Sequence, residues 1–125
     1  MRGVDCAFTV WVARYIALEE RSGGDPGRVR VVYERALADC FWSEELWQAY
    51  VDFADRGGVP RAFVLPVHVR ATRNCLQSGK LWALRLRAAE RADIPLADLV
   101  GIWERARLLP LHDAEGYVQV CSDCR

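Results

Sequence analysis

The sequence predicts an all-α fold, in which helical hairpins stack into a right-handed α-α superhelix. An Arg-Ala pair recurs every 35 residues, at Arg35, Arg70 and Arg105, and a period near 35 residues is typical of helical-hairpin repeats. Apolar residues follow the spacing of one helix face, and cap residues and prolines stand where helices are expected to begin. No segment has the alternating apolar pattern of a competing β-strand.

Start and stop signals place the expected helices along the chain. Asp25 and Pro26 open the second helix as cap and first helical residue. Ser43 is the expected N-cap of the third helix, and Gly57 and Gly58 end that helix. We therefore expect helices near residues 8–21, 26–40, 43–56, 60–74, 79–92, 95–109 and 113 to the end.

Three prolines bear on the fourth and sixth helices. Pro60 and Pro95 are 35 residues apart and are expected at the first helical positions. Pro66 lies inside the fourth helix, where a proline removes a backbone hydrogen bond and clashes with the carbonyl group four residues earlier. That helix is therefore expected either to be kinked there or to have an irregular first turn.

A repeat signature combines aromatic and small residues in the two helices of each hairpin. We expect three repeats, near residues 8–42, 43–77 and 78–112, and a partial fourth over 113–125, within a single domain that is a fragment of a longer array. Small alanines let helices approach closely while aromatic rings fill the space between hairpins. The signature residues are Tyr15, Trp47, Tyr50 and Trp82 on first helices, and Tyr33, His68, Trp103, Arg35, Arg70, Arg105, Ala36, Ala71 and Ala106 on second helices.

Acidic residues near the ends of the first helices keep the same register. Each precedes a second-helix arginine by 15 residues. We hypothesise that each pair fixes the crossing of its hairpin, the alternative being that both charges face solvent. The pairs are Glu20 with Arg35, Asp55 with Arg70, and Glu90 with Arg105.

Charge is balanced overall but segregated along the chain. The formal net charge is zero, which disfavours recruitment of nucleic acid or membrane by an overall basic field. Residues 36–55 contain acids and no base, whereas residues 56–89 contain bases and no acid. Neighbouring helices of opposite charge complement each other on stacking; the alternative is a basic face that binds a partner.

The cysteines and the chain start point to a reducing compartment. The first residues lack the pattern of a secretory signal, and five cysteines is an odd number for a disulfide framework. We therefore expect an intracellular protein with reduced thiols, in which Cys40 and Cys75 are small core residues.

No arrangement of residues predicts catalysis or a bound cofactor. Cys121 and Cys124 form a CxxC pair, but no strand precedes it, and with His112 it offers only three zinc ligands. No Ser-His-Asp set, catalytic acid pair or phosphate-binding glycine loop is visible. We therefore expect a protein that is not an enzyme and binds no metal or cofactor.

The signature resembles the half-a-tetratricopeptide (HAT) repeat of RNA-processing factors. The resemblance covers residues 8 to 109, including "GDPGRVRVVYERAL", "LWQAYVDF" and "VLPVHVRATRNC" followed by "LW". It implies an α-superhelix that contacts other proteins of an RNA-processing complex and self-associates. It also implies a nuclear location and a role in pre-mRNA splicing, in assembly and recycling of the U4/U6 snRNP. Arg85, Val12 and Pro66 depart from the residues the family favours at those positions.

Two other functions remain open from the sequence. The basic region 56–87 would suit a direct RNA-binding module, although its arginines are spread over two helices, aromatic residues are few there and RNA contact is disfavoured. A tetratricopeptide-like co-chaperone adaptor is the second alternative, but its 34-residue period fits less well than 35.

Overall fold

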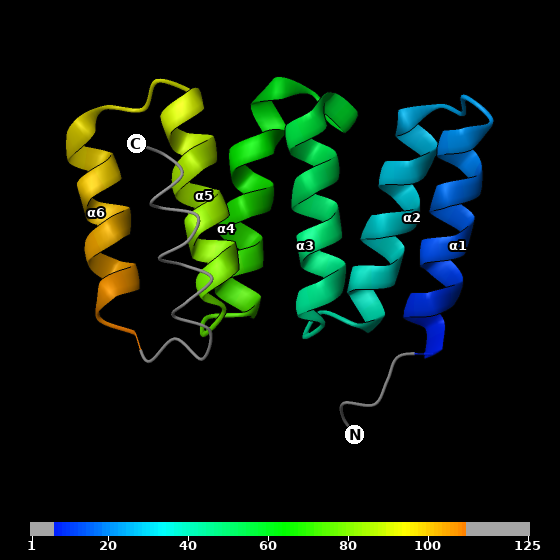
Figure 1. The fold of residues 1–125 in the computed structure, drawn as a ribbon, viewed down its shortest axis with the longest axis horizontal. Coiled ribbons are helices and arrows are strands. Elements are labelled where there is room, and N and C mark those ends of the chain that lie inside the picture. The colour runs from blue at the N-terminus through cyan, green and yellow to red at the C-terminus, as the bar shows by residue number, and fades with distance from the viewer. Residues whose placement is uncertain (1–6, 110–125) are drawn as a thin grey trace. The chain divides into compact units, whose positions relative to one another are not determined.

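The computed structural model describes residues 7–109, and all regular structure in that range is helical (Figure 1). The expected all-α class is confirmed, and the first six expected helices are found within a few residues of their expected bounds. The helix expected from residue 113 lies outside the described residues. The elements are α1 (Ala7–Arg21), α2 (Pro26–Asp39), α3 (Glu44–Phe53), the π-helical turn η1 (Ala54–Gly58), the 3₁₀ turn η2 (Arg61–Phe63), α4 (Val64–Asn74), α5 (Gly79–Arg91) and α6 (Leu96–Arg107).

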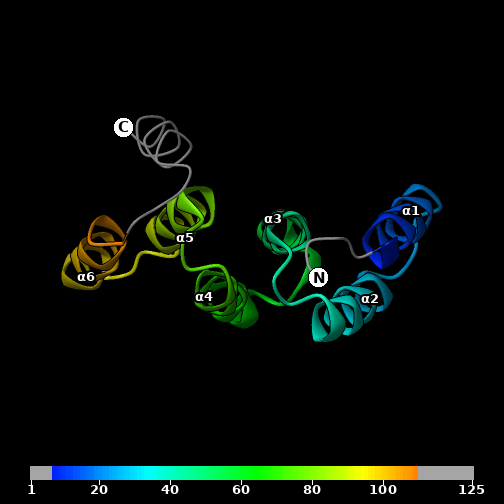
Figure 2. The ribbon, with the colours of Figure 1, turned by 90° about the horizontal axis from the view of Figure 1, so that it is seen from below.

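The chain divides after Arg61 into two compact units. In the first unit, α2 packs against both α1 and α3, and η1 continues α3 and also touches α2. In the second unit, α5 packs against both α4 and α6, and Figure 2 shows these three helices nearly end-on. The division falls within residues 43–77, which the sequence period assigns to one repeat. Over residues 7–109, no helix is long and apolar enough to cross a membrane.

Side-chain caps begin three of the helices. The Asp25 carboxylate accepts a hydrogen bond from the Gly27 amide over 3.1 Å, at the start of α2. Ser43 caps α3 by accepting from the Leu46 amide over 3.2 Å, so both expected caps are confirmed. Ser78 caps α5 in the same way, accepting from the amide of Leu81 over 3.3 Å.

The end of α3 depends on two glycines. Gly57 has a φ of 99°, a left-handed conformation that favours glycine, and it closes the widened turn η1. A Cβ atom on Gly58 would lie 2.3 Å from the ring of Phe53. The expected stop at Gly57 and Gly58 is therefore confirmed, and each glycine is required for a different reason.

The prolines differ in part from their expected positions. Pro95 stands one residue before α6, at the N-cap, and Pro60 immediately precedes the 3₁₀ turn η2. Pro66 is the third residue of α4, because residues 61–63 form a separate 3₁₀ turn. An amide in the first turn of a helix has no intrahelical acceptor, so the missing N–H of Pro66 costs no helical hydrogen bond. Of the two alternatives for Pro66, the irregular first turn is correct.

Candidate functional site

The connection between helices recurs with the same hydrogen bonds in the two units. In the first unit, the indole Nε1 of Trp47 donates to the Phe41 carbonyl oxygen over 2.8 Å. In the second unit, Nε1 of Trp82 donates to the carbonyl oxygen of Leu76 over 2.9 Å. Donors and acceptors are both 35 residues apart, and so are the capping serines that follow each acceptor. The sequence period therefore corresponds to a repeated local structure.

The signature residues divide into buried and exposed sets. Tyr15 is 36% exposed and Trp103 is 42% exposed, so these two aromatic residues do not fill the described core. Arg35 and Arg105 are exposed, and Arg70 is half-buried. The remaining signature residues, all buried, are Trp47, Tyr50, Trp82, Tyr33, His68, Ala36, Ala71 and Ala106.

Aromatic rings close the core of the first unit. The ring of Tyr33 stacks on Tyr50 with centroids 4.9 Å apart and lies 5.3 Å from the ring of Phe53. Burial raises the pKa of Tyr33 to about 12. The Tyr50 hydroxyl donates to Glu34 over 2.5 Å, and burial followed by this hydrogen bond raises the pKa of Tyr50. These ring contacts and this hydrogen bond pack α2 against α3.

The second unit has different residues at the corresponding positions. Thirty-five residues after Leu37, Tyr50 and Phe53 stand Thr72, Arg85 and Ala88. Each replacement is smaller or more polar than its counterpart, so the aromatic packing of the first unit cannot form here. The helices of the second unit pack around a pocket instead.

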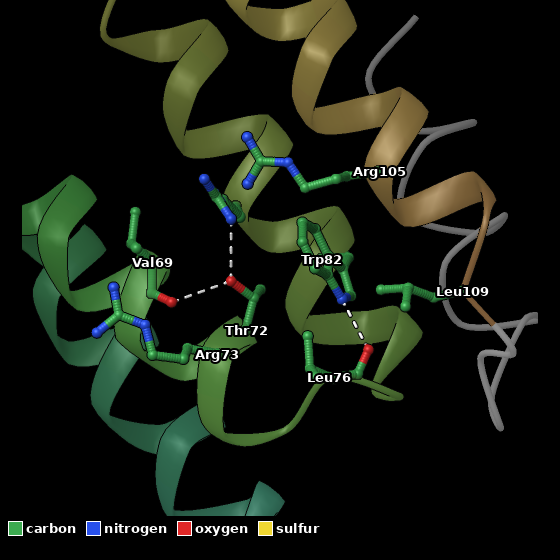
Figure 3. A pocket seen from close by; sticks show the side chains of 8 residues that line it. Val69, Thr72, Arg73, Leu76, Trp82, Arg105 and Leu109 are labelled. Atoms are coloured by element: carbon green, nitrogen blue, oxygen red, sulfur yellow. Dashed lines mark hydrogen bonds between the residues drawn. The ribbon is translucent and has the colours of Figure 1, made fainter.

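This pocket has a volume of about 270 Å³, and the described residues that line it all belong to the second unit (Figure 3). It combines an apolar wall with three guanidinium groups, and none of its lining residues within 7–109 is acidic. Helices α4, α5 and α6 all contribute to it. Its lining residues are Val69, Thr72, Arg73, Leu76, Trp82, Arg85, Arg105 and Leu109.

Arg85 is held in place by its neighbours in the pocket. Its Nη1 donates to the Thr72 hydroxyl over 3.0 Å, and its guanidinium carbon lies 5.2 Å from the Trp82 ring centroid. The Thr72 hydroxyl lies 3.1 Å from the Val69 carbonyl oxygen, to which it donates (Figure 3). Burial, and then the positive charge of Arg105, lower the pKa of Arg85. The pocket therefore presents a positioned cation beside a second cation.

The structure does not form two of the three hypothesised charge pairs. Among residues 7–109, no ion pair joins Glu20 to Arg35 or Glu90 to Arg105. The carboxylate of Glu20 instead lies 3.7 Å from Arg56, which also pairs with Asp52 over 3.0 Å. The reason is that Arg35 and Arg105 are both exposed, and Arg105 lines the pocket beside Arg85. Asp55 and Arg70 belong to different units, and their pairing stays a prediction.

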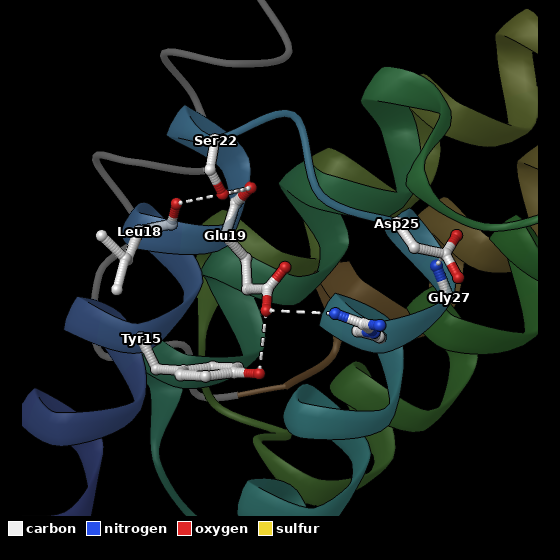
Figure 4. A network of polar contacts seen from close by, with 7 residues as sticks. Tyr15, Leu18, Glu19, Ser22, Asp25 and Gly27 are labelled. Atoms are coloured by element: carbon white, nitrogen blue, oxygen red, sulfur yellow. Dashed lines mark hydrogen bonds and ion pairs between the residues drawn. The ribbon is translucent and has the colours of Figure 1, made fainter.

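A polar network joins α1 to the start of α2 (Figure 4). The Tyr15 hydroxyl donates to Glu19 over 3.0 Å, and the same carboxylate oxygen lies 3.9 Å from Arg28. The hydrogen bond to Glu19 and the charge of that residue raise the pKa of Tyr15. The Ser22 hydroxyl donates back to the Leu18 carbonyl oxygen and closes the end of α1. Tyr15 therefore takes part in a surface polar network and not in the core.

Cys40 and Cys75 are 35 residues apart and differ in whether they form a disulfide bond. Cys75 is buried and is not disulfide-bonded, as expected. Cys40 is also buried but is disulfide-bonded, so the expectation of a reduced thiol is wrong at this position. Among the residues that the structure describes, no group of His, Cys, Asp and Glu could hold a metal ion. His112, Cys121 and Cys124 lie outside that range.

The pocket was not predicted from the sequence, although a signal for it was present. Arg85 stands at the repeat position that tyrosine occupies in the other two repeats, as Tyr15 and Tyr50. A charged residue at a position that is buried in another repeat indicates that the packing there has changed. Comparison with known proteins adds no assignment: the chain matches no protein-family model, and it matches no curated protein.

Proposed function

We propose that this chain is a non-catalytic protein–protein interaction scaffold of a nuclear RNA-processing factor, built from HAT-type helical repeats. The observation that carries this proposal is the recurrence of one helix connection, with the Trp47 and Trp82 hydrogen bonds 35 residues apart. Stacked helical repeats present extended surfaces to partners, and proteins of this architecture function mainly through those surfaces.

The process proposed is pre-mRNA splicing, in assembly or recycling of the U4/U6 snRNP. This part rests on the resemblance of residues 67–75, "VHVRATRNC", and their flanks to the HAT domain of the spliceosome recycling factor squamous cell carcinoma antigen recognised by T-cells 3. The proposed partners are proteins of that complex, and self-association is part of the proposal.

Affinity capture from nuclear extract tests the scaffold proposal. The folded chain, immobilised as bait, is expected to retain U4/U6 snRNP proteins both before and after ribonuclease treatment. A bait carrying Trp47→Ala, whose core is damaged, is expected to lose them, and Trp103→Ala provides the matched control because that ring is exposed. Fluorescence microscopy of the tagged full-length protein is expected to show it in the nucleus.

Two outcomes would contradict the proposal. Retention that disappears after ribonuclease treatment would favour the RNA-binding alternative over residues 56–87. Retention of chaperones in place of splicing proteins would favour the co-chaperone alternative.

A further inference from the structure

The pocket of the second unit has the composition of an anion site. Arg73 and Arg85 come from neighbouring helices, Arg105 comes from α6, and no carboxylate among residues 7–109 is paired with any of them. A guanidinium group has five N–H donors, and one donor of Arg85 is used by Thr72. Most of the donor capacity at this pocket is therefore available to a ligand.

The half-buried position of Arg85 beside Arg105 indicates that its positive charge serves to bind a ligand. Placing a cation in a half-buried site beside another cation is unfavourable, and both effects lower the pKa of this guanidinium. The first unit shows that a tyrosine fits the corresponding position, where Tyr50 is completely buried. An anion in the pocket would offset the repulsion between Arg85 and Arg105 and restore the lost solvation.

The walls limit what kind of anion fits. Val69, Leu76 and Leu109 supply apolar surface, which suits the hydrocarbon part of a ligand. The ring of Trp82 is only 2% exposed and lies beneath Arg85, so it offers no open platform on which a nucleic-acid base could stack. The combination suits an acidic side chain with an apolar neighbour, as a peptide presents, better than a nucleotide.

We propose that the pocket between α4, α5 and α6 binds an oxyanion-bearing side chain of a partner peptide, flanked by an apolar residue. The oxyanion is a carboxylate or a phosphate monoester, since guanidinium groups bind both through paired N–H donors. This inference rests on the proposed scaffold function and names the chemistry of the segment that the scaffold would hold.

Binding of labelled short peptides to the full chain tests this inference by fluorescence anisotropy. The peptides share one sequence of leucine, alanine and serine and differ only at their central residues, which are glutamate, phosphoserine or glutamine. The glutamate or the phosphoserine peptide is expected to bind, and the glutamine peptide is expected to bind at least about tenfold more weakly. Comparing the first two peptides identifies which oxyanion the pocket prefers.

Arginine variants link that binding to the pocket. Arg105→Gln changes an exposed side chain and is expected to weaken binding about tenfold, the effect of losing one charge-assisted hydrogen bond. Arg85→Gln is expected to do the same, and Arg85→Tyr, which restores the residue of the first unit, is expected to abolish binding. Arg87→Gln is the matched control on α5, because Arg87 lies outside the pocket lining and should leave binding unchanged. Circular dichroism shows whether each variant is folded. If the Arg85 variants are unfolded, the Arg105→Gln variant alone tests whether the peptide binds at the pocket.

Each remaining outcome overturns the inference. It is wrong if neither acidic peptide binds, or if Arg87→Gln weakens binding as much as Arg105→Gln. It is also wrong if a single-stranded oligonucleotide binds with the same dependence on Arg105, or if that variant only dissociates a dimer of the chain detected by light scattering. If no acidic peptide binds but nuclear proteins are still captured, only the peptide-binding proposal for the pocket is refuted. If a peptide binds but no nuclear proteins are captured, the scaffold proposal is refuted.

Discussion

The indole nitrogen of Trp82 donates to the carbonyl oxygen of Leu76 over 2.9 Å, six residues earlier in the chain. Trp47 makes the matching bond to Phe41 over 2.8 Å in the other unit. Each bond ties the first turn of one helix to the connection that precedes it, so a single buried side chain contributes both packing and a hydrogen bond. The energetic consequences of this arrangement can be measured.

Replacing Trp47 by alanine should strongly destabilise the protein. The side chain is 1% exposed and donates a hydrogen bond, and removing a large buried aromatic group costs about 3 to 5 kcal/mol. Urea unfolding measures the loss. Trp103→Ala removes the same side chain from a site that is 42% exposed and should cost less than about 1 kcal/mol. Equal losses in the two variants would show that Trp47 is not a core residue.

The hydroxyl of Tyr50 should contribute more to stability than that of Tyr15, although both donate to glutamate. Tyr50→Phe removes a 2.5 Å bond to Glu34 at a fully buried ring and should cost about 1.5 kcal/mol. Tyr15→Phe removes a 3.0 Å bond to Glu19 at an exposed ring and should change the free energy of unfolding by less than about 0.5 kcal/mol. Thermal or urea unfolding of the two variants distinguishes these values.

Stability should fall in alkaline solution because of Tyr33. Its pKa is raised from 10.0 to about 12, so in the folded state it keeps its proton where the unfolded chain has lost it. The contribution of Tyr33 is therefore complete below pH 10 and is lost as the pH rises from 10 to 12. In Tyr33→Phe, the decline over this interval should be shallower. An unchanged pH dependence in that variant would contradict the assigned burial effect.

Adding one methyl group at Gly58 should destabilise the first unit. The new Cβ atom would lie 2.3 Å from the Phe53 ring, and overpacking of this kind costs about 1 to 3 kcal/mol. Gly101 is the control, since a Cβ atom there meets nothing within 4 Å. Gly101→Ala should stabilise α6 by about 0.5 to 1 kcal/mol, because alanine favours a helix interior over glycine. Opposite signs of the two changes in unfolding free energy are the expected result.

A double-mutant cycle on Glu20 and Arg35 should give a coupling energy near zero. Glu20 pairs instead with Arg56, whose side chain is 55% exposed, and a cycle on that pair should give only about 0.2 to 1 kcal/mol. Unfolding free energies of the single and double variants provide both values. A larger coupling for Glu20 with Arg35 would show that the hypothesised hairpin pair forms in solution.

The sequence was sufficient to predict the helices because their ends carry local signals. Asp25, Ser43 and Gly57 act on backbone groups within a few residues, and such effects can be read without knowledge of tertiary structure. The period of 35 correctly located the buried Trp47 and Trp82 for a similar reason, since equivalent positions have equivalent local structure.

The charge contacts and the pocket could not be predicted in the same way. A fixed spacing of 15 residues does not determine which way long side chains turn, so Glu20 was assigned to Arg35 although it lies near Arg56. The pocket depends on side chains from three helices and on the loss of ring packing at Arg85 and Ala88. Only the packed structure shows that these replacements leave space and do not allow the helices to close together.

Tyr50 of the first unit and Arg85 of the second stand at corresponding positions, so the two units are packed differently there. Stacked aromatic rings pack the helices of the first unit, whereas the second unit lacks the corresponding rings around its pocket. Among the described residues, a molecule that fills the pocket would contact α4, α5, α6 and the residues that adjoin them. Ligand binding would therefore stabilise these helices and slow amide hydrogen exchange locally in α4, α5 and α6.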